Sequence, residues 1–512
     1  MAVNKNEKII RDIVHEYIEL DQFFVMLVND KYFQRLRHIK QLTCQYVYPS
    51  ANHTRFEHSL GVYYLSRRCL TALKQEVFRV FEITESEFKS LFYHLSVAAL
   101  LHDVGHAPLS HLGEIYYRKD EIKTRLKLLC KDKEIDFGIF NFGSAHELMS
   151  CYIILEHFRT YLEDNEFEEY ENIKVDLELI CRMIVGAQYD GSRAANIAIE
   201  VLNSSTIDMD KLDYIMRDSH MTGISTPPID VNRFFKGLMI TDNTKKIVLK
   251  KQAITVVQNI IDARDCLYLL VCNHHITVYT DFVYEYYMKH LMLLHQKKSA
   301  KGFKDSLNPN EFFSCNAVLN NLVDDHDLLH SLKKHFIDNK NVSEYTATLT
   351  PQLFEHKFLK PLWKNLYEYR LFLNTEISDT DIVRDLEKKM CDSNYIYRRY
   401  VAREIMKRAK INAGEIFIVP RSNKFYSASS ENNFYISVDG NLKDISELLP
   451  QKQFNNMYNN VLFYVFCKDE YKDIVKNKFV EIAREGLPDK AELEKEPINR
   501  PEWLDQYKDT FY

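Results

Sequence analysis

Glycine and proline are scarce in this sequence, with 13 Gly and 12 Pro among 512 residues. Because both residues interrupt regular structure, their scarcity excludes a turn-rich β fold and favours long helices. The ten cysteines include no CxxC pair, which favours reduced thiols over a disulfide framework. No apolar run reaches the roughly 18 residues of a membrane span, and the polar segment from Met1 to Glu7 lacks the apolar region of a secretory signal. These absences predict a cytoplasmic protein with no membrane partner.

The sequence also lacks an excess of positive charge, because its formal net charge is −6. It therefore has no global basic signature for nucleic acid, and that class of partner has no support at this level. A hydrophobic share of 46% and a charged share of 27% are those of an ordinary globular protein. A chain of this length is sufficient for about two to four domains.

The residue pattern changes along the chain. Apolar residues recur at helical spacing from Phe33 to His111, and Leu238 to Lys301 contains neither Gly nor Pro. Beyond residue 340, apolar and polar residues alternate as in half-buried strands, at Glu415–Val419, Phe434–Val438 and Val461–Cys467. We expect a mainly α fold, with a helical catalytic domain at 1–344 and a smaller α+β lobe with a charged tail at 345–512.

A His-Asp pair, His102 and Asp103, stands at the end of an apolar helical segment. A lone pair is weak evidence, since a helix-terminal His beside a surface Asp has the same appearance, and His326-Asp327 repeats the dipeptide in a polar setting. His58 upstream and Asp210 downstream complete a set of two imidazoles and two carboxylates. Such a set suits Mn²⁺, Fe²⁺, Zn²⁺ or Mg²⁺ with positions left for water, and it indicates hydrolysis of a phosphate ester.

Side chains around this set suit a polyphosphate. Lys211, Tyr214 and Asp218 share one helical face with Asp210 one turn away. Arg55 and Arg264 are candidates for bidentate contacts to phosphate. The alternatives are a solvated Lys211, a Tyr214 in the core and an Arg264 in a surface ion pair.

The motifs together resemble a known family. They are Phe33–Leu42, Tyr48-Pro49, His53–Gly61, Leu101–His111 and Asp208–Asp218. This arrangement is similar to the deoxynucleoside-triphosphate triphosphohydrolases of the HD superfamily, above all the type with a SAM and an HD domain. The likeness runs from about Asp12 to Tyr279 and more faintly to about Lys468. We expect no SAM domain, because the chain starts almost at the catalytic domain.

The resemblance implies a role for each matching residue. The metal ligands are His58, His102, Asp103 and Asp210. The histidines around the α-phosphate are His106, His111 and His146, with His146 as the general acid. The phosphate-binding residues are Arg55, Lys211 and Arg264. The residues that close on the sugar and leave no room for a 2′-hydroxyl are Gln41, Leu42, Tyr214 and Asp218.

Two positions depart from the family pattern. Cys272 replaces a tyrosine that lies against the sugar and base. Asn29 replaces an aspartate that reads an activating guanine, whereas Lys8, Gln34 and Arg37 match other residues of that nucleotide site. Drift without functional effect is the alternative at both departures. The resemblance implies a homo-oligomer, dimer or tetramer, with an activating nucleotide at a subunit contact.

The leading hypothesis is an enzyme that cuts dNTPs to deoxynucleoside and triphosphate. Water would attack the α-phosphorus, and an imidazolium would protonate the departing 5′-oxygen. A second hypothesis keeps the divalent metal but changes the substrate to a nucleotide messenger or single-stranded nucleic acid, which makes the protein an HD phosphodiesterase. A third is a nucleotide-gated scaffold without required turnover.

Overall fold

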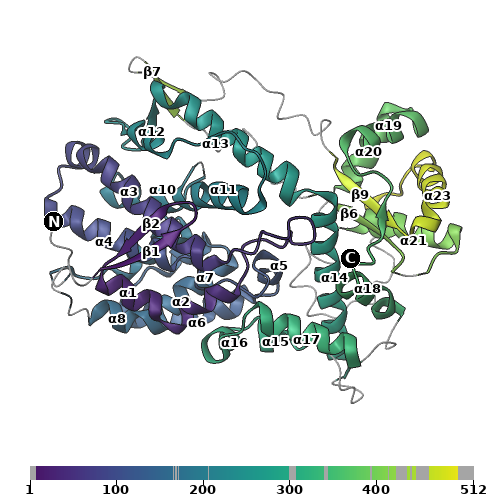
Figure 1. The fold of residues 1–512 in the computed structure, drawn as a ribbon, viewed down its shortest axis with the longest axis horizontal. Helices are drawn as coiled ribbons and strands as arrows, with labels where there is room; N and C mark the ends of the chain where they lie inside the picture. Colours follow the sequence, from purple (N-terminus) through teal and green to yellow (C-terminus); the bar gives the residue numbers. More distant parts are fainter. Residues whose placement is uncertain are drawn as a thin grey trace. The chain divides into compact units, whose positions relative to one another are not determined.

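The computed structural model describes residues 7–164, 167, 170, 172–205, 207–298, 307–338, 344–391, 395–412, 414–421, 435–438, 441–444 and 461–493. The chain forms two compact units, drawn in Figure 1. The first comprises Met1–Leu270, Pro309–Leu328 and Phe425–Phe454, and the second comprises Val271–Asn308, Leu329–Lys424 and Asn455–Tyr512. The domain boundary expected at residue 344 falls inside the second unit.

The first unit is mainly helical. Its helices are α1 (Gln22–Asn29), α2 (Lys31–Arg35), α3 (Arg55–Phe81), α4 (Glu85–Leu101), α5 (His111–Glu114), α6 (Lys119–Lys133), α7 (Ala145–Ile153), α8 (Arg159–Glu163), α9 (Leu177–Val185), α10 (Ala194–Leu202), α11 (Met209–Thr222), α12 (Val231–Lys236), α13 (Ile254–Leu267), α15 (Pro309–Phe312) and α16 (Cys315–Asn321). Helix α17 (Asp325–Asp338) begins in the first unit and continues into the second.

Two small sheets belong to the first unit. Strands β1 (Lys8–Asp12) and β2 (Glu16–Leu20) form an antiparallel hairpin. The other sheet has the order β3-β4-β7-β8, with bounds Leu238–Ile240, Ile247–Lys250, Tyr435–Val438 and Asn441–Asp444.

Strand β7 corrects one sequence expectation. The strand expected at Phe434–Val438 was assigned to the C-terminal lobe, but β7 pairs in parallel with β4 of the first unit. Ile436 lies opposite Leu249 in this register and is completely buried, so the pairing adds apolar surface to the first unit's core. Phe434 itself lies outside the described residues.

Helices α3, α4 and α11 form the core that positions the site. The second half of α4 is apolar and fully buried, because Leu95 and the run Val97–Leu101 are shielded from solvent. Helix α3 packs against both α4 and α11. Gly61 permits the approach of α11, since a Cβ at this position would lie 1.9 Å from Asp213 Oδ1. Any larger residue there would displace the carboxylate of Asp213.

The second unit combines helices with a three-stranded sheet. Its elements are α14 (His275–Lys298), α18 (Glu344–Phe354), β5 (Lys360–Pro361), α19 (Leu366–Glu376), α20 (Thr380–Met390), α21 (Ile396–Ala409), β6 (Ile416–Pro420), β9 (Phe463–Cys467), α23 (Lys472–Glu485) and α24 (Lys490–Leu493). The sheet order is β5-β9-β6, and both pairings are antiparallel.

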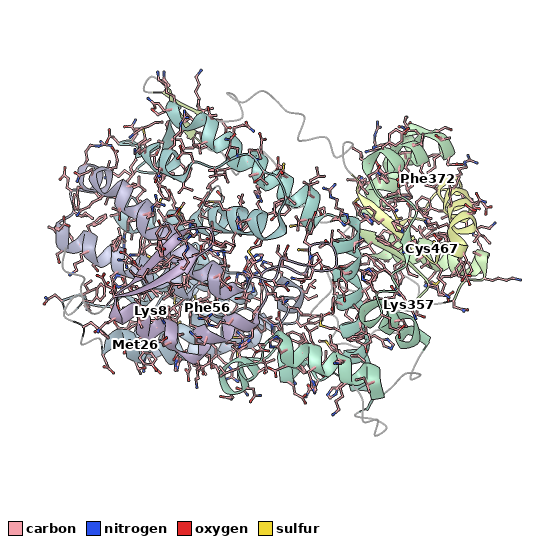
Figure 2. The ribbon with its side chains drawn as sticks, in the orientation of Figure 1. Lys8, Met26, Phe56, Lys357, Phe372 and Cys467 are labelled. Carbon is pink, nitrogen blue, oxygen red and sulfur yellow. The ribbon has the colours of Figure 1, made fainter. Side chains whose placement is uncertain are left out.

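An aromatic cluster forms the core of the second unit. The Trp363 ring stacks on Phe372, labelled in Figure 2, at a centroid distance of 5.2 Å. Trp363 Nε1 also donates to the carbonyl of Phe463 at 2.9 Å. The expected mainly α fold with a smaller α+β part is thus confirmed. None of the helices in the described ranges is long and apolar enough to cross a membrane.

Candidate active site

The HD dipeptide lies immediately after α4, where the buried helix ends. His102 Nδ1 and the carbonyl of Ala99 are 2.9 Å apart, which places the proton on Nδ1 and leaves the Nε2 lone pair available. His102 Nε2 is buried and has no hydrogen-bond partner within the described part of the chain. Gly105 allows this loop to pack on α7, because a Cβ there would lie 2.3 Å from the backbone nitrogen of Ser150.

The first turn of α3 supplies the next two side chains. Thr54 and Glu57 form a capping box that starts the helix, and Arg55 and His58 are both buried just inside it. Arg55 Nη1 donates to Asp103 Oδ2 at 2.8 Å. Burial alone would raise the pKa of Asp103, but the charges of Arg55 and neighbouring histidines hold that pKa well below its usual value.

The first turn of α11 brings Asp210 to the same place. Asp208 caps this helix by accepting from the Lys211 backbone nitrogen at 2.7 Å. Asp210 Oδ1 lies 2.9 Å from His58 Nε2 and 4.0 Å from His102 Nε2. The structure therefore brings all four predicted metal ligands together.

This donor set fits a divalent cation. One atom each from His58, His102 and Asp103 lies within 4.8 Å of the others, and Asp210 contacts both imidazoles. A buried imidazole nitrogen with no hydrogen-bond partner is costly unless it binds a ligand, so the burial of His102 Nε2 indicates a ligand there. Imidazole and carboxylate together suit Mn²⁺, Fe²⁺ or Zn²⁺, and the exposed fraction of Asp210, 41%, leaves access for water.

A buried network orients His58. Asp213 Oδ2 lies 2.8 Å from His58 Nδ1, and Asp213 Oδ1 lies 2.6 Å from His15 Nε2. Arg217 donates to both oxygens of Asp213, at 2.8 and 3.0 Å, and its Nη1 donates to Asp12 at 2.8 Å. Burial lowers the pKa of His58, but hydrogen bonds to Asp210 and Asp213 outweigh it and raise that pKa to about 10. To bind a cation through Nε2, His58 must therefore release a proton.

We expect the Asp213→Asn substitution to lower the affinity for Mn²⁺ by about 10- to 100-fold, the usual effect of losing a carboxylate behind a ligating histidine. Calorimetric titration of the metal-free protein measures this change, and Asp190→Asn, at an exposed position, is the control. An unchanged affinity in a variant with wild-type melting temperature would show that Asp213 does not position His58.

Three histidines form a cluster beside the metal-ligand set. His106 Nε2 lies 3.2 Å from Asp103 Oδ1, and the His106 and His146 rings stack at a centroid distance of 4.0 Å. Glu114 Oε2 lies 2.9 Å from His111 Nδ1, and Glu114 Oε1 lies 2.9 Å from His146 Nδ1. The structure thus brings the three predicted histidines together around one carboxylate.

The cluster distributes charge unequally. Burial lowers the pKa of His146, but Glu114 outweighs that effect and raises it above the usual value. Burial and the nearby Arg55 keep the pKa of His106 well below its usual value. His146 is therefore the member that best retains a proton. With its Nδ1 held by Glu114, the ring nitrogen left to face a substrate is Nε2.

The predicted phosphate-binding residues differ in their surroundings. Arg55 Nε donates to Ser110 Oγ at 2.9 Å as well as binding Asp103, so its guanidinium is fixed at the site. Lys211 binds the Asp208 carboxylate and donates to the Ser204 carbonyl at 2.7 Å. It is therefore not the solvated side chain of the alternative interpretation.

Arg264 of α13 interacts with Tyr214 of α11. Burial lowers the pKa of Arg264, but the electrostatic interactions and hydrogen bonds with Tyr214 and Tyr268 outweigh burial and raise that pKa. The guanidinium also lies 5.1 Å from the Tyr268 ring centroid. Tyr214 and Arg264 therefore form a unit next to Asp210.

The predicted sugar-binding residues lie on the adjoining loop and helix. Gln41 follows the short bridge between Lys40 and Thr54, and its backbone nitrogen donates to the His53 carbonyl at 3.1 Å. His53 Nε2 lies 2.7 Å from Asp218 Oδ1, so this loop is joined to α11. Leu42 is half-buried beside Gln41.

Cys272 belongs to the second unit, where it lines a cavity of about 270 Å³ with Phe282 and Arg421. The other predicted substrate residues lie in the first unit.

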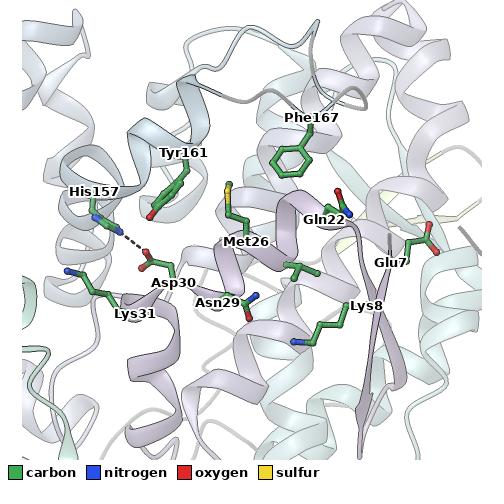
Figure 3. Close-up of a pocket in the computed structure, with 11 residues that line it drawn as sticks. Glu7, Lys8, Gln22, Met26, Asn29, Asp30, Lys31, His157, Tyr161 and Phe167 are labelled. Carbon is green, nitrogen blue, oxygen red and sulfur yellow. Dashed lines mark hydrogen bonds and ion pairs between the residues drawn. The ribbon is translucent and has the colours of Figure 1, made fainter. Parts of the chain in front are cut away.

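The expected activator residues are only partly brought together. Lys8 and Asn29 line a cavity of about 920 Å³ in the first unit, shown in Figure 3. Gln34 and Arg37 are not in its lining; Arg37 Nε donates to Gln34 Oε1 at 2.8 Å. Asp30 faces the same cavity, but its carboxylate lies 2.7 Å from His157 Nε2 and also caps α2.

Sequence reasoning missed the carboxylates that hold the histidines. Asp213 stands three residues after Asp210 and four before Arg217, a helical spacing that could have drawn attention to it. Glu114 stands three residues after His111 in the same way. No sequence signal indicated His15 or His53, because each meets its aspartate partner only through the fold.

Residues 55–191 match the HD domain family. The chain is 29% identical over 280 residues to a Dictyostelium discoideum deoxynucleoside triphosphate triphosphohydrolase SAMHD1 homolog, covering 54% of this chain and 48% of that protein. It is 30% identical over 281 residues to deoxynucleoside triphosphate triphosphohydrolase SAMHD1 of Bos taurus, covering 53% and 46%. It is also 29% identical over 316 residues to an uncharacterized protein of Mycoplasma genitalium, covering 61% and 64%.

The chain spans about half the length of the SAMHD1 relatives it matches. Its fold is similar to that of a phosphohydrolase from Bacteroides thetaiotaomicron, with a TM-score of 0.60 and 23% identity over 90% of this chain and 100% of that one. The HD domain family is metal-dependent, in agreement with the His/Asp cluster that can bind a metal ion.

Proposed function

From the HD domain that this chain contains, we propose that it hydrolyses dNTPs to deoxynucleoside and triphosphate. The observation that carries this proposal is the surroundings of Asp103. This carboxylate contacts two other predicted metal ligands, His58 and His102. It also contacts Arg55, which is predicted to bind phosphate, and His106 of the histidine cluster. The residues predicted for metal binding, phosphate binding and proton donation therefore lie within one set of contacts.

A divalent cation held by His58, His102, Asp103 and Asp210 would polarise a phosphoryl oxygen and lower the pKa of a water. Arg55 and Lys211 would balance the negative charge of the triphosphate. His146, the histidine with the raised pKa, would donate its proton to the 5′-oxygen as the bond from that oxygen to the α-phosphorus breaks.

The sugar side of the proposal depends on Gln41. Its Oε1 is buried and has no hydrogen-bond partner in the described residues. A buried acceptor without a partner is costly, so it favours a ligand that offers a hydroxyl or N–H group. Asp218, held by His53, and Tyr214 would define the rest of the sugar contact.

The test is a product analysis with Mn²⁺ or Mg²⁺ and a panel of dNTPs, NTPs, cyclic dinucleotides and single-stranded DNA. We expect deoxynucleoside and triphosphate in equal amounts, with label from ¹⁸O-water in the triphosphate. Release of pyrophosphate and a nucleoside monophosphate from dNTPs would contradict the proposal. Cleavage of the cyclic dinucleotides or DNA alone would establish the phosphodiesterase alternative, and binding without turnover the scaffold.

We further propose that guanine nucleotides do not activate this protein. If the cavity at Lys8 and Asn29 binds a base, Asn29 presents one acceptor and one donor, whereas guanine's edge offers two N–H donors. The mismatch costs about 1–3 kcal/mol, or about five- to over a hundredfold in affinity. Asp30 cannot substitute while His157 and the α2 cap hold its carboxylate. An adenine edge suits Asn29 better.

Rate and sedimentation measurements without activator, with GTP and with ATP or dATP test this prediction. We expect either a response to the adenine nucleotides or activity of a preformed dimer or tetramer, and Asn29→Asp should increase the response to GTP. Strong, selective activation of the unchanged protein by GTP would contradict it.

A further inference from the structure

A further group of metal-ligand side chains lies in the first unit, outside both the HD-type set and the histidine cluster around Glu114. His38, Asp324 and His326 each offer one atom, and these atoms lie within 4.8 Å of one another. The rings of His38 and His326 have centroids 5.3 Å apart. His326 belongs to the second His-Asp dipeptide of the sequence, which by itself gave no reason to expect a metal.

The three donors are available for binding. Among the described residues, neither ring of His38 and His326 makes a hydrogen bond, and both side chains are exposed. Asp324 Oδ1 accepts from the backbone nitrogens of His326 at 2.8 Å and Asp327 at 3.3 Å. These bonds fix the carboxylate and leave Oδ2 for a ligand, as is usual for metal-binding carboxylates.

The backbone around the cluster is firmly held. Asp325, between Asp324 and His326, accepts from the backbone nitrogen of Lys40 at 2.9 Å and from that of Leu109 at 2.7 Å. The buried Arg35 donates to the Val323 carbonyl at 2.7 Å. The backbone of both segments that carry the ligands is thus held before any metal binds, which lowers the ordering cost of binding.

We propose that His38, Asp324 and His326 bind Zn²⁺, separately from the HD-type site. Two imidazoles and one carboxylate form a set that zinc accepts, with solvent completing the four-coordinate shell. Mg²⁺ and Ca²⁺ prefer shells built of oxygen, so the imidazoles disfavour them. Because both histidines are exposed, the ion reaches the site directly from solvent.

The position of this site gives it a stabilising role. Zinc would connect His38 to the start of α17. Asp325, next to the ligands, already accepts hydrogen bonds from Lys40, which precedes Gln41, and from Leu109, which lies two residues before His111. Leu109 and Ser110 have positive φ angles of 59° and 55°, a strained conformation that needs such support. Zinc at about 100 times its Kd would shift the unfolding equilibrium about 100-fold towards the folded state.

The experiment isolates this site by working in the Asp210→Ala background, where the HD-type site has lost a ligand. Protein stripped with a chelator is titrated with Zn²⁺ by calorimetry, and its melting temperature is measured with and without the ion. We expect one equivalent of Zn²⁺ to bind and to raise the melting temperature. Adding His326→Gln or His38→Gln should abolish both effects, whereas His330→Gln, an exposed histidine further along α17, should leave them intact.

Substitution with Co²⁺ gives an independent signature, because visible d–d absorption reports imidazole ligation and should disappear with His326→Gln. The Zn²⁺-free melting temperatures show whether each variant folds. If the His326→Gln variant folds and binds one Zn²⁺ with the same melting shift, the proposal is overturned. The result is independent of dNTP hydrolysis, because the Asp210→Ala protein is not required to be active.

Discussion

The Asp210→Ala substitution is expected to abolish both the metal at the HD-type site and hydrolysis, with the helical fold retained. Asp210 contacts His58 and His102 and is one of two carboxylates in the set. Its loss removes one of the four ligands and one of the two negative charges that balance the dication. The exposed fraction of its side chain is 41%, so the substitution leaves no sealed cavity and little loss of stability is expected.

Metal analysis after dialysis against Mn²⁺, a dNTP hydrolysis assay and a circular dichroism melt measure the three expectations. Asp103→Ala should have the same effect on metal and activity with a larger loss of stability, because it removes the partner of the buried Arg55. Asp190→Ala, at an exposed position, is the control for removal of a carboxylate. An Asp210→Ala enzyme that remains active without detectable metal would refute the site assignment.

The proximity of the four proposed metal ligands could be predicted because local sequence marks each of them. His102 and Asp103 follow an apolar helix, and Asp210 lies inside the first turn of another, so helical periodicity alone aligns them with a buried core. His58 belongs to a motif of consecutive residues, Thr54 to His58, that also contains the cap of α3. The motif therefore places His58 in the first turn of that helix. Residues of this kind are visible without knowledge of the tertiary fold.

The groups that hold these ligands could not be predicted because they meet across long separations. His15 and Asp213 are 198 residues apart, and Glu114 meets His146 from 32 residues away, with α6 between them. A histidine or glutamate on a helix carries no local sign of which distant partner it will face. The same reason explains why β7 was expected in the C-terminal lobe, because neither strand's sequence indicates that β7 pairs with β4 of the first unit.

His146→Gln is expected to lower turnover by about a hundredfold or more, the usual contribution of general acid catalysis. The imidazole stacks on His106 and holds its Nδ1 proton on Glu114, so Nε2 is oriented rather than free to rotate. Glutamine approximates the size of histidine but cannot act as an acid near neutral pH. Metal content should stay near wild type, and Mn²⁺ analysis of the variant checks this.

The pH dependence separates an acid from a merely structural histidine. Glu114 raises the pKa of His146, so the protonated, active form persists to higher pH than for an ordinary histidine, and turnover falls as pH rises through that pKa. Glu114→Gln removes the carboxylate, lowers the pKa of His146 and should move the alkaline limb of the kcat profile to lower pH. Glu134→Gln, at an exposed position, should leave the profile unchanged. If His146→Gln retains full turnover between pH 6 and 9, or Glu114→Gln leaves the alkaline limb in place, the proton comes from another group.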